Sequence, residues 1–562
     1  MSGKRSKRAY GLFALAIGAA ASCPASAQTP PPPAATCPVA NFSSWQGPSN
    51  GSTLNFVPPN SAAFSTKSNP VGFCSFYLWA SQMFLWLTST DAAGNFTLFS
   101  PTFYTAVETP TGFTFVQNAE NSLTAGLGSK SLFHVRVNKS RVSLATLLKL
   151  KAAAAQGQPT PANETGQAGG GGVLIVNGQP VAVPGNTEGY ATYPIVYYTV
   201  QVNDVFAGLA QHFGEVPYFT QAGSQLGQLP TTQPQVQQIA KAANVSSYAD
   251  QDQLALEVKS AWVDAAYLPP QVAASRLLTI TAEVPAFQHS AQNGLVVLTS
   301  DGTVTAQRTL ALVGMHVVGT VANHPEMVWA TFETPFNAPD APYAYLNNTT
   351  TVTNPNQPTC PSNDNCIATV SLSSNTASSN PYIFYNGNQP ASVAPSDITI
   401  TATSSTSQGK IAITFTSATS PRASPLQLAP TSAVRLNPWG NLQPSSPAVS
   451  DAVTQNNTLL LSLEASLAPQ LITAGKNGGV LANYLETGAL WTNGVIPKGQ
   501  SNQSALKEFG STSLANTTME TFQQSSPGSL TQAPAVQPAA NCFSCHAAFN
   551  GTAASISHVF PN

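Results

Sequence analysis

The pattern Cys542-x-x-Cys545-His546 lies at the far end of this 562-residue chain, and its position limits what the chain can fold into. Only 16 residues follow His546, so any group held by these side chains must pack against structure from earlier in the sequence. The sequence therefore predicts a large body that receives a short C-terminal tail.

Two thiols two residues apart, followed by an imidazole, are typical of covalent haem attachment. The thiols of Cys542 and Cys545 add to the two vinyl groups of the porphyrin, and His546 becomes the proximal iron ligand. A thioredoxin-like disulfide and a zinc site completed by His558 are the alternatives. The first needs a βαβ setting, whereas this motif follows a Pro/Ser/Gln/Ala linker. In the second, the zinc cysteines would risk oxidation after export. We therefore expect one covalent haem c.

The sixth position of the iron can be filled from three places. His558 lies twelve residues after His546 and is the most economical distal ligand. Met519 is a weaker alternative because a lone methionine on an apolar helix face usually packs in a core. An upstream histidine is the third possibility, and otherwise the iron stays open.

Two upstream histidines, His316 and His324, lie in the segment GMHVVGTVANHPEMVWATFE, which also contains Glu326, Trp329 and Glu333. His316, His324 and Glu326 are weak candidates for acid–base groups on a substrate side of the haem. The plainer interpretation is a pair of core or turn histidines with carboxylates that form hydrogen bonds at a hairpin.

The N-terminus indicates export. Residues 1–27 combine four basic residues, a short apolar run and an Ala25-Ser26-Ala27 cleavage pattern, as a signal peptide does. Its removal leaves 17 basic and 23 acidic residues, a net charge of −6. No basic patch suggests nucleic acid, and no later segment is apolar enough to predict a transmembrane helix. We expect a periplasmic or extracellular protein.

Six cysteines remain after the signal, and four lie outside the motif. An even number in an oxidising compartment favours disulfides. We expect the pairs Cys37–Cys74 and Cys360–Cys366, although four cysteines allow three pairings.

The composition divides the chain into five parts after the signal, within an α+β fold that has a β-rich centre. Predicted strands include 193–204, 276–284 and 309–321, and predicted helices include 74–89, 251–268, 448–471, 479–491 and 513–524. The parts are a Pro/Ser-rich leader (28–60), a mixed body (61–345), a Ser/Thr-rich β insert (346–425), a helical region (426–524) and a linker with the haem-binding tail (525–562).

The segments GMHVVGTVANHPEMVWATFE, NAPDAPY, LANTTMETF, NCFSCHAAF and SHVF together resemble an uncharacterised family of exported bacterial mono-haem cytochrome c-like proteins. The likeness covers about residues 70–345 and 430–562 and implies export and haem attachment, without naming a reaction. The family often has a further histidine after the Phe-Glu pair, whereas Thr334 stands there in this chain.

Three function classes fit these features. Electron transfer through a closed haem, with a redox partner protein, is favoured because His558 can complete the coordination. A peroxidase-like haem oxidoreductase with an open iron is the alternative, and a haem-containing binding or sensor protein is the third. The sequence does not indicate a substrate or an oligomeric state.

Overall fold

The strand-forming segments of the sequence meet in one large antiparallel sheet. In the computed structural model it has ten strands in the order β19-β18-β13-β12-β8-β7-β1-β2, with β3 paired to β7 and β9 to β12. All these pairs are antiparallel. The strands are β1 (Phe103–Thr109), β2 (Gly112–Gln117), β3 (His134–Val135), β7 (Val196–Asn203), β8 (Leu256–Asp264), β9 (Thr279–Pro285), β12 (Thr305–Val321), β13 (His324–Glu333), β18 (Leu485–Thr492) and β19 (Glu508–Gly510).

The structure describes part of the chain. The described residues are 37–49, 51, 53–66, 72–91, 94–109, 112–120, 122–125, 133–135, 138–139, 174–176, 179–181, 196–220, 227–285, 287–289, 296–298, 305–341, 343–346, 367–370, 382–384, 399–404, 411–416, 435, 437–441, 451–497, 507–519, 541–546, 556–557 and 559–560.

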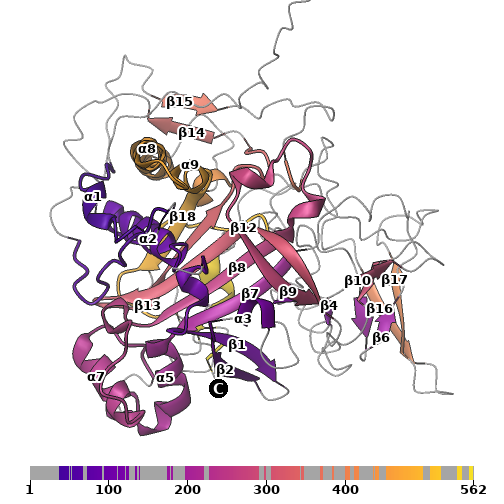
Figure 1. Cartoon of the computed structure of the whole chain (residues 1–562), viewed down its shortest axis with the longest axis horizontal. Coiled ribbons are helices and arrows are strands. Elements are labelled where there is room, and N and C mark those ends of the chain that lie inside the picture. Colours follow the sequence, from indigo (N-terminus) through magenta and orange to yellow (C-terminus); the bar gives the residue numbers. More distant parts are fainter. Residues whose placement is uncertain are drawn as a thin grey trace, which may run out of the picture.

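Helices cover the sheet in two groups (Figure 1). Helices α2 and α8 lie together at one end of the view, and α5 and α7 lie side by side at the other. The helices are α1 (Phe42–Trp45), α2 (Phe73–Leu87), α3 (Ser122–Ala125), α5 (Asp204–His212), α6 (Pro217–Thr220), α7 (Gln233–Ala242), α8 (Asp451–Ala474), α9 (Gly478–Leu481) and α10 (Cys542–Cys545).

Two apolar cores result from this arrangement. The larger one joins α2 and α8 to the sheet, with Phe84 of α2 stacked on Phe332 of β13 at 4.5 Å between ring centroids. The smaller core lies around α5 and includes Trp329 of β13 and Phe560 near the C-terminus. Because side chains alternate between the faces of a strand, Trp329 and Phe332 belong to opposite sides of the sheet.

Smaller two- and three-stranded sheets lie outside the large one. Within the segment predicted as a β insert, the described residues include strands β15, β16 and β17. The bounds are β4 (Asn138–Lys139), β5 (Leu174–Val176) and β6 (Gln179–Val181); β10 (Phe287–His289) with β11 (Val296–Leu298); β14 (Tyr343–Leu346) with β15 (Ile367–Val370); and β16 (Thr399–Ser404) with β17 (Ile411–Thr416).

The α+β class is confirmed, with helices packed on a large antiparallel sheet. The predicted helix over 251–268 is wrong, since β8 occupies its centre. The apolar residues of a strand buried on both faces do not alternate, so their spacing also satisfies a helix.

The region predicted as helical, 426–524, contains one long helix, α8, but also two strands of the large sheet. The helix predicted over 479–491 is one turn, α9, followed by β18, which pairs with β13 and β19. Within the helix predicted over 513–524, residues 514–519 form loop and turn, since Asn516 Oδ1 accepts a hydrogen bond from the Thr518 N–H at 2.8 Å. Such side-chain bonds compete with helical ones.

A disulfide joins Cys37 to Cys74 at the start of α2, as predicted. Both residues are fully buried in the larger core. The second predicted pair, Cys360–Cys366, lies outside the described residues. Among the helices of the described residues, none is long and apolar enough to cross a membrane.

Removing the disulfide is expected to lower the free energy of unfolding by about 3–4 kcal/mol, because the bond closes a loop with a sequence separation of 37. The measurement is urea unfolding of the Cys37→Ala/Cys74→Ala variant. Reductant should weaken the parent protein more than the variant, which keeps only the predicted Cys360–Cys366 pair. Equal stability of parent and variant would contradict the expectation.

Candidate haem-attachment site

Cys542 to Cys545 form a single helical turn, α10, and the residue that precedes it is fixed to the sheet. Asn541 caps the turn by accepting the Phe543 N–H at 2.9 Å. Its Nδ2 donates to Glu508 Oε2 of β19 at 2.6 Å and to the Thr512 carbonyl at 2.9 Å. The motif therefore begins at a defined point on the edge of the sheet.

His546 follows this turn and lies against β13. Its ring is 4.1 Å from the indole of Trp329, measured between centroids, and its Nδ1 lies 2.6 Å from the Ile556 carbonyl oxygen. A carbonyl oxygen can only accept a hydrogen bond, so Nδ1 is the nitrogen that carries the hydrogen. Nε2 then becomes the nitrogen suited to a metal. This is the tautomer that a proximal haem ligand requires.

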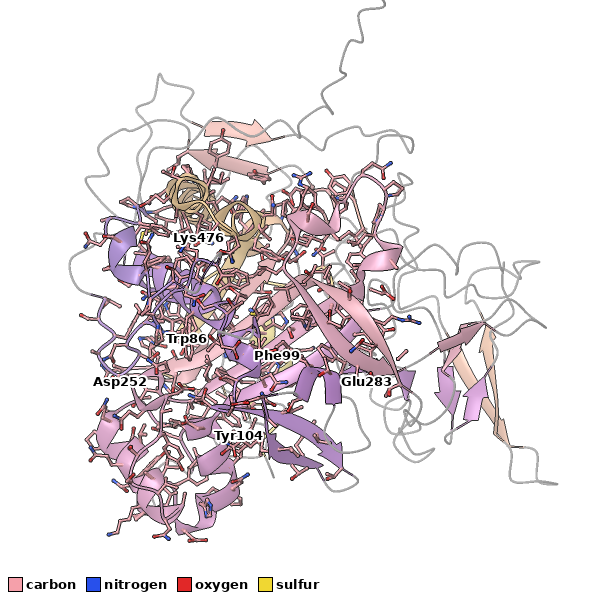
Figure 2. The ribbon with its side chains drawn as sticks, in the orientation of Figure 1. Trp86, Phe99, Tyr104, Asp252, Glu283 and Lys476 are labelled. Atoms are coloured by element: carbon pink, nitrogen blue, oxygen red, sulfur yellow. A yellow bond between two sulfur atoms is a disulfide. The ribbon has the colours of Figure 1, made fainter. Side chains whose placement is uncertain are left out.

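Described residues of the tail contact a row of residues that are register neighbours across six adjacent strands. We call this row the tail row; Tyr104, its last member, is labelled in Figure 2. It consists of Leu490, Trp329, Val318, Glu257, Val202 and Tyr104, from β18, β13, β12, β8, β7 and β1.

The tail contacts two members of this row and one aromatic cluster beyond it. Phe543 and His546 contact Trp329, and Ser557 Oγ donates to Glu257 Oε2 at 2.6 Å. Beyond them, Phe560 packs on the aromatic rings of the α5–α6 region, with Phe219 stacked at 5.7 Å. The tail is thus part of the smaller apolar core rather than a separate domain.

Glu257 is a buried carboxyl beneath the tail. Burial raises its pKa to about 7, while the hydrogen bond from Ser557 and the charge of Lys259 oppose the rise. Near neutral pH this group is therefore divided between its charged and neutral forms.

The upstream candidates are separated by the sheet. His316 pairs in register with Thr331 and lies two residues from Val318 on β12. Residues two apart on a strand share a face, so His316 lies on the tail side of the sheet. His324, at the start of β13, packs on Phe76 of α2, and its Nδ1 contacts Glu326 Oε1 at 2.8 Å. Seven residues of strand, ~23 Å, separate His324 from Thr331. His316 is therefore not close enough to act with the His324–Glu326 pair.

The two distal candidates from the C-terminal part are placed differently. Met519 is fully buried in the larger core, in a turn that begins where the Thr517 N–H donates to Glu333 Oε1 at 2.6 Å. His558 lies outside the described residues. Within the described ranges, no group of three or more His, Cys, Asp or Glu side chains could hold a metal ion.

Trp329, Glu257 and Ile556 are site residues whose roles were not predicted. Trp329 lies in the same sequence segment as His316, but its contact with the tail joins residues more than 200 positions apart in the sequence. No local pattern signals such a contact.

Comparisons with protein-family models, with curated proteins and with solved structures find no match for this chain.

Proposed function

We propose that this protein is an exported mono-haem c-type cytochrome, with the porphyrin bonded to Cys542 and Cys545 and the iron held by His546. The observation that carries the proposal is the hydrogen bond from His546 Nδ1 to the Ile556 carbonyl, which makes Nε2 the nitrogen suited to a metal. The surroundings also fit a porphyrin, because Trp329, Phe543, Val559 and Phe560 give the tail an apolar setting.

Electron transfer is the role that this arrangement supports best. When bound, the haem supplies the one-electron couple of its iron. The protein's part is to hold the proximal histidine in place, and the Trp329 contact and the Asn541 anchor support that role. A redox partner protein would exchange electrons with the haem. Export through residues 1–27 places this exchange in the periplasm or outside the cell.

A haem-dependent oxidoreductase is the second candidate. The observation that favours it is His316, a partly exposed histidine on the tail side of the sheet. On an open iron such a side chain could hold or move a proton. His324 and Glu326 would take no part, since they lie on the α2 side.

The proposal is tested by producing the protein in a bacterial host competent for cytochrome maturation. We expect red protein whose C-terminal peptide keeps one haem mass after denaturation. Cys542→Ser/Cys545→Ser should lose covalent haem, whereas Cys37→Ala/Cys74→Ala, which alters the other described cysteines, should retain it. A colourless parent protein whose tail peptide has no added mass would refute the proposal.

A further inference from the structure

Three central strands of the sheet are buried except at one residue each. In β7 the exception is Val200, in β8 it is Lys259, and along Leu310–Val321 of β12 it is His316. Partial exposure of a histidine and a lysine in the middle of a ten-stranded sheet requires that nothing packs fully over them.

These three exceptions are neighbours. His316 pairs in register with Lys259, and Lys259 pairs with Val200. We call these three residues the central opening. The next register positions, Val318, Glu257 and Val202, belong to the tail row, so the opening lies beside the tail on the same face of the sheet.

The other side of the opening is covered by the segment 516–518. The hydroxyl of Tyr198 donates to the Thr518 carbonyl at 2.7 Å, and Asn516 Nδ2 donates to Thr331 Oγ1 at 2.8 Å. A Cβ added to Gly314 would lie 2.5 Å from Thr518 Oγ1, so this segment touches the sheet directly. On β7 and β12 the residues contacted by the segment, Tyr198 and Gly314, lie four residues from the tail row, about 13 Å, whereas on β13 Asn516 contacts Thr331, the register neighbour of His316.

The chemistry of the opening suits a porphyrin carried by the tail. A haem has two faces that accept an axial nitrogen, and two propionates that carry negative charge. His316 offers an imidazole. Lys259 offers an ammonium group, which lies 5.7 Å from the centre of the Tyr198 ring. Val200 adds an apolar surface at the end of the opening.

We propose that the haem lies over the central opening, with His316 as the axial ligand opposite His546 and Lys259 paired with a propionate. This inference rests on the proposed haem attachment. Among the described alternatives, Met519 is fully buried, and His324 contacts Glu326 on the far side of the sheet.

The test compares optical and electron paramagnetic resonance spectra of the parent protein with those of His316→Ala, His558→Ala and a control, His212→Ala. His212 lies on α5 and is partly exposed. We expect the parent, His558→Ala and His212→Ala to be low-spin and indifferent to carbon monoxide. His316→Ala should become high-spin and bind carbon monoxide, and added imidazole should restore the low-spin spectrum.

Other results overturn the ligand assignment. They are a low-spin His316→Ala variant, a His558→Ala variant that alone binds carbon monoxide, and a parent protein that already binds it. If His316→Ala does not fold, His316→Gln, which keeps the size of the side chain, gives the same reading. Covalent haem content is measured in every sample, so a parent without haem refutes the proposed function, and a parent with haem but unaltered variants refutes this inference alone.

The role proposed for Lys259 is tested separately, by the midpoint potential of the haem. We expect Lys259→Gln to lower the haem midpoint potential, because loss of a nearby cation disfavours the added electron, while Lys241→Gln on α7 leaves it unchanged. An unaltered potential in Lys259→Gln would refute the propionate contact.

Discussion

Replacing Arg435 by leucine is expected to lower the free energy of unfolding by about 3–5 kcal/mol, because the change leaves a buried carboxylate without its cation. Arg435 is 3% exposed and Glu333 is fully buried. The guanidinium donates to Glu333 Oε2 at 3.2 Å and also pairs with Asp340.

The position of the Arg435–Glu333 pair explains why its loss would also affect neighbouring segments. Glu333 also accepts hydrogen bonds from Asn337 Nδ2 at 3.1 Å and from the Thr517 N–H at 2.6 Å. It therefore links the end of β13 to the segment that borders the central opening. Loss of Arg435 should loosen that segment as well as destabilise the whole fold.

Denaturant unfolding of Arg435→Leu provides the measurement. The control is Arg308→Leu, which removes a pair in which Arg308 is 50% exposed and the buried Asp264 still accepts the Ala266 N–H, and is expected to cost about 1 kcal/mol or less. The double variant Arg435→Leu/Glu333→Gln should recover part of the lost stability, because it also removes the buried charge of Glu333 that Arg435→Leu leaves without its cation. If Arg435→Leu is no less stable than Arg308→Leu, the buried pair does not contribute as argued.

The local sequence was enough to predict the elements with a clear pattern. The apolar run at 74–89 forms α2, and the alternating segments at 193–204 and 309–321 form β7 and β12. β8 was misread as a helix, and β18 likewise, because both gain their strand conformation from partners on each side. Such pairing overrides local propensity.

The candidate site divides in the same way. The spacing of Cys542, Cys545 and His546 is a local feature and could be identified without the fold. The contact of His546 with Trp329, and the alignment of His316 with Lys259, depend on the register of strands far apart in sequence. Only the folded sheet shows which histidine shares a face with the tail.

Stability is expected to fall as the pH rises from about 4 to about 8, the reverse of the usual acid lability. Burial raises the pKa of Asp250 and of Glu464 to about 8 each, and of Asp204 to about 6; the Asp204 charge adds to the rise at Asp250. Burial also raises the pKa of Glu486, and the charge of the neighbouring Glu464 adds to that rise. These groups lie in two clusters, one at the start of α5 and one between α8 and β18.

The sign follows from proton binding. Each carboxyl keeps its proton to a higher pH in the folded chain than in the unfolded chain, so folding takes up protons in this window. The stabilisation is complete below the unfolded pKa values near 4 and is lost as the pH passes the folded values. At about 1.4 kcal/mol per pKa unit, several such groups give a total on the order of several kcal/mol.

Urea unfolding of the haem-loaded protein at pH 4.5, 6 and 8 measures this slope. Glu464→Gln should flatten it, because an amide has no proton to lose, yet its Oε1 can still accept the Glu486 N–H that Glu464 accepts at 2.8 Å. Glu215→Gln, at a side chain 67% exposed, should leave the slope unchanged. Stability that rises between pH 4.5 and pH 8 would show that the buried carboxyls are ionised in the folded protein. A slope of the expected sign would instead mean that these buried acids are neutral in the folded protein and favour folding in mild acid.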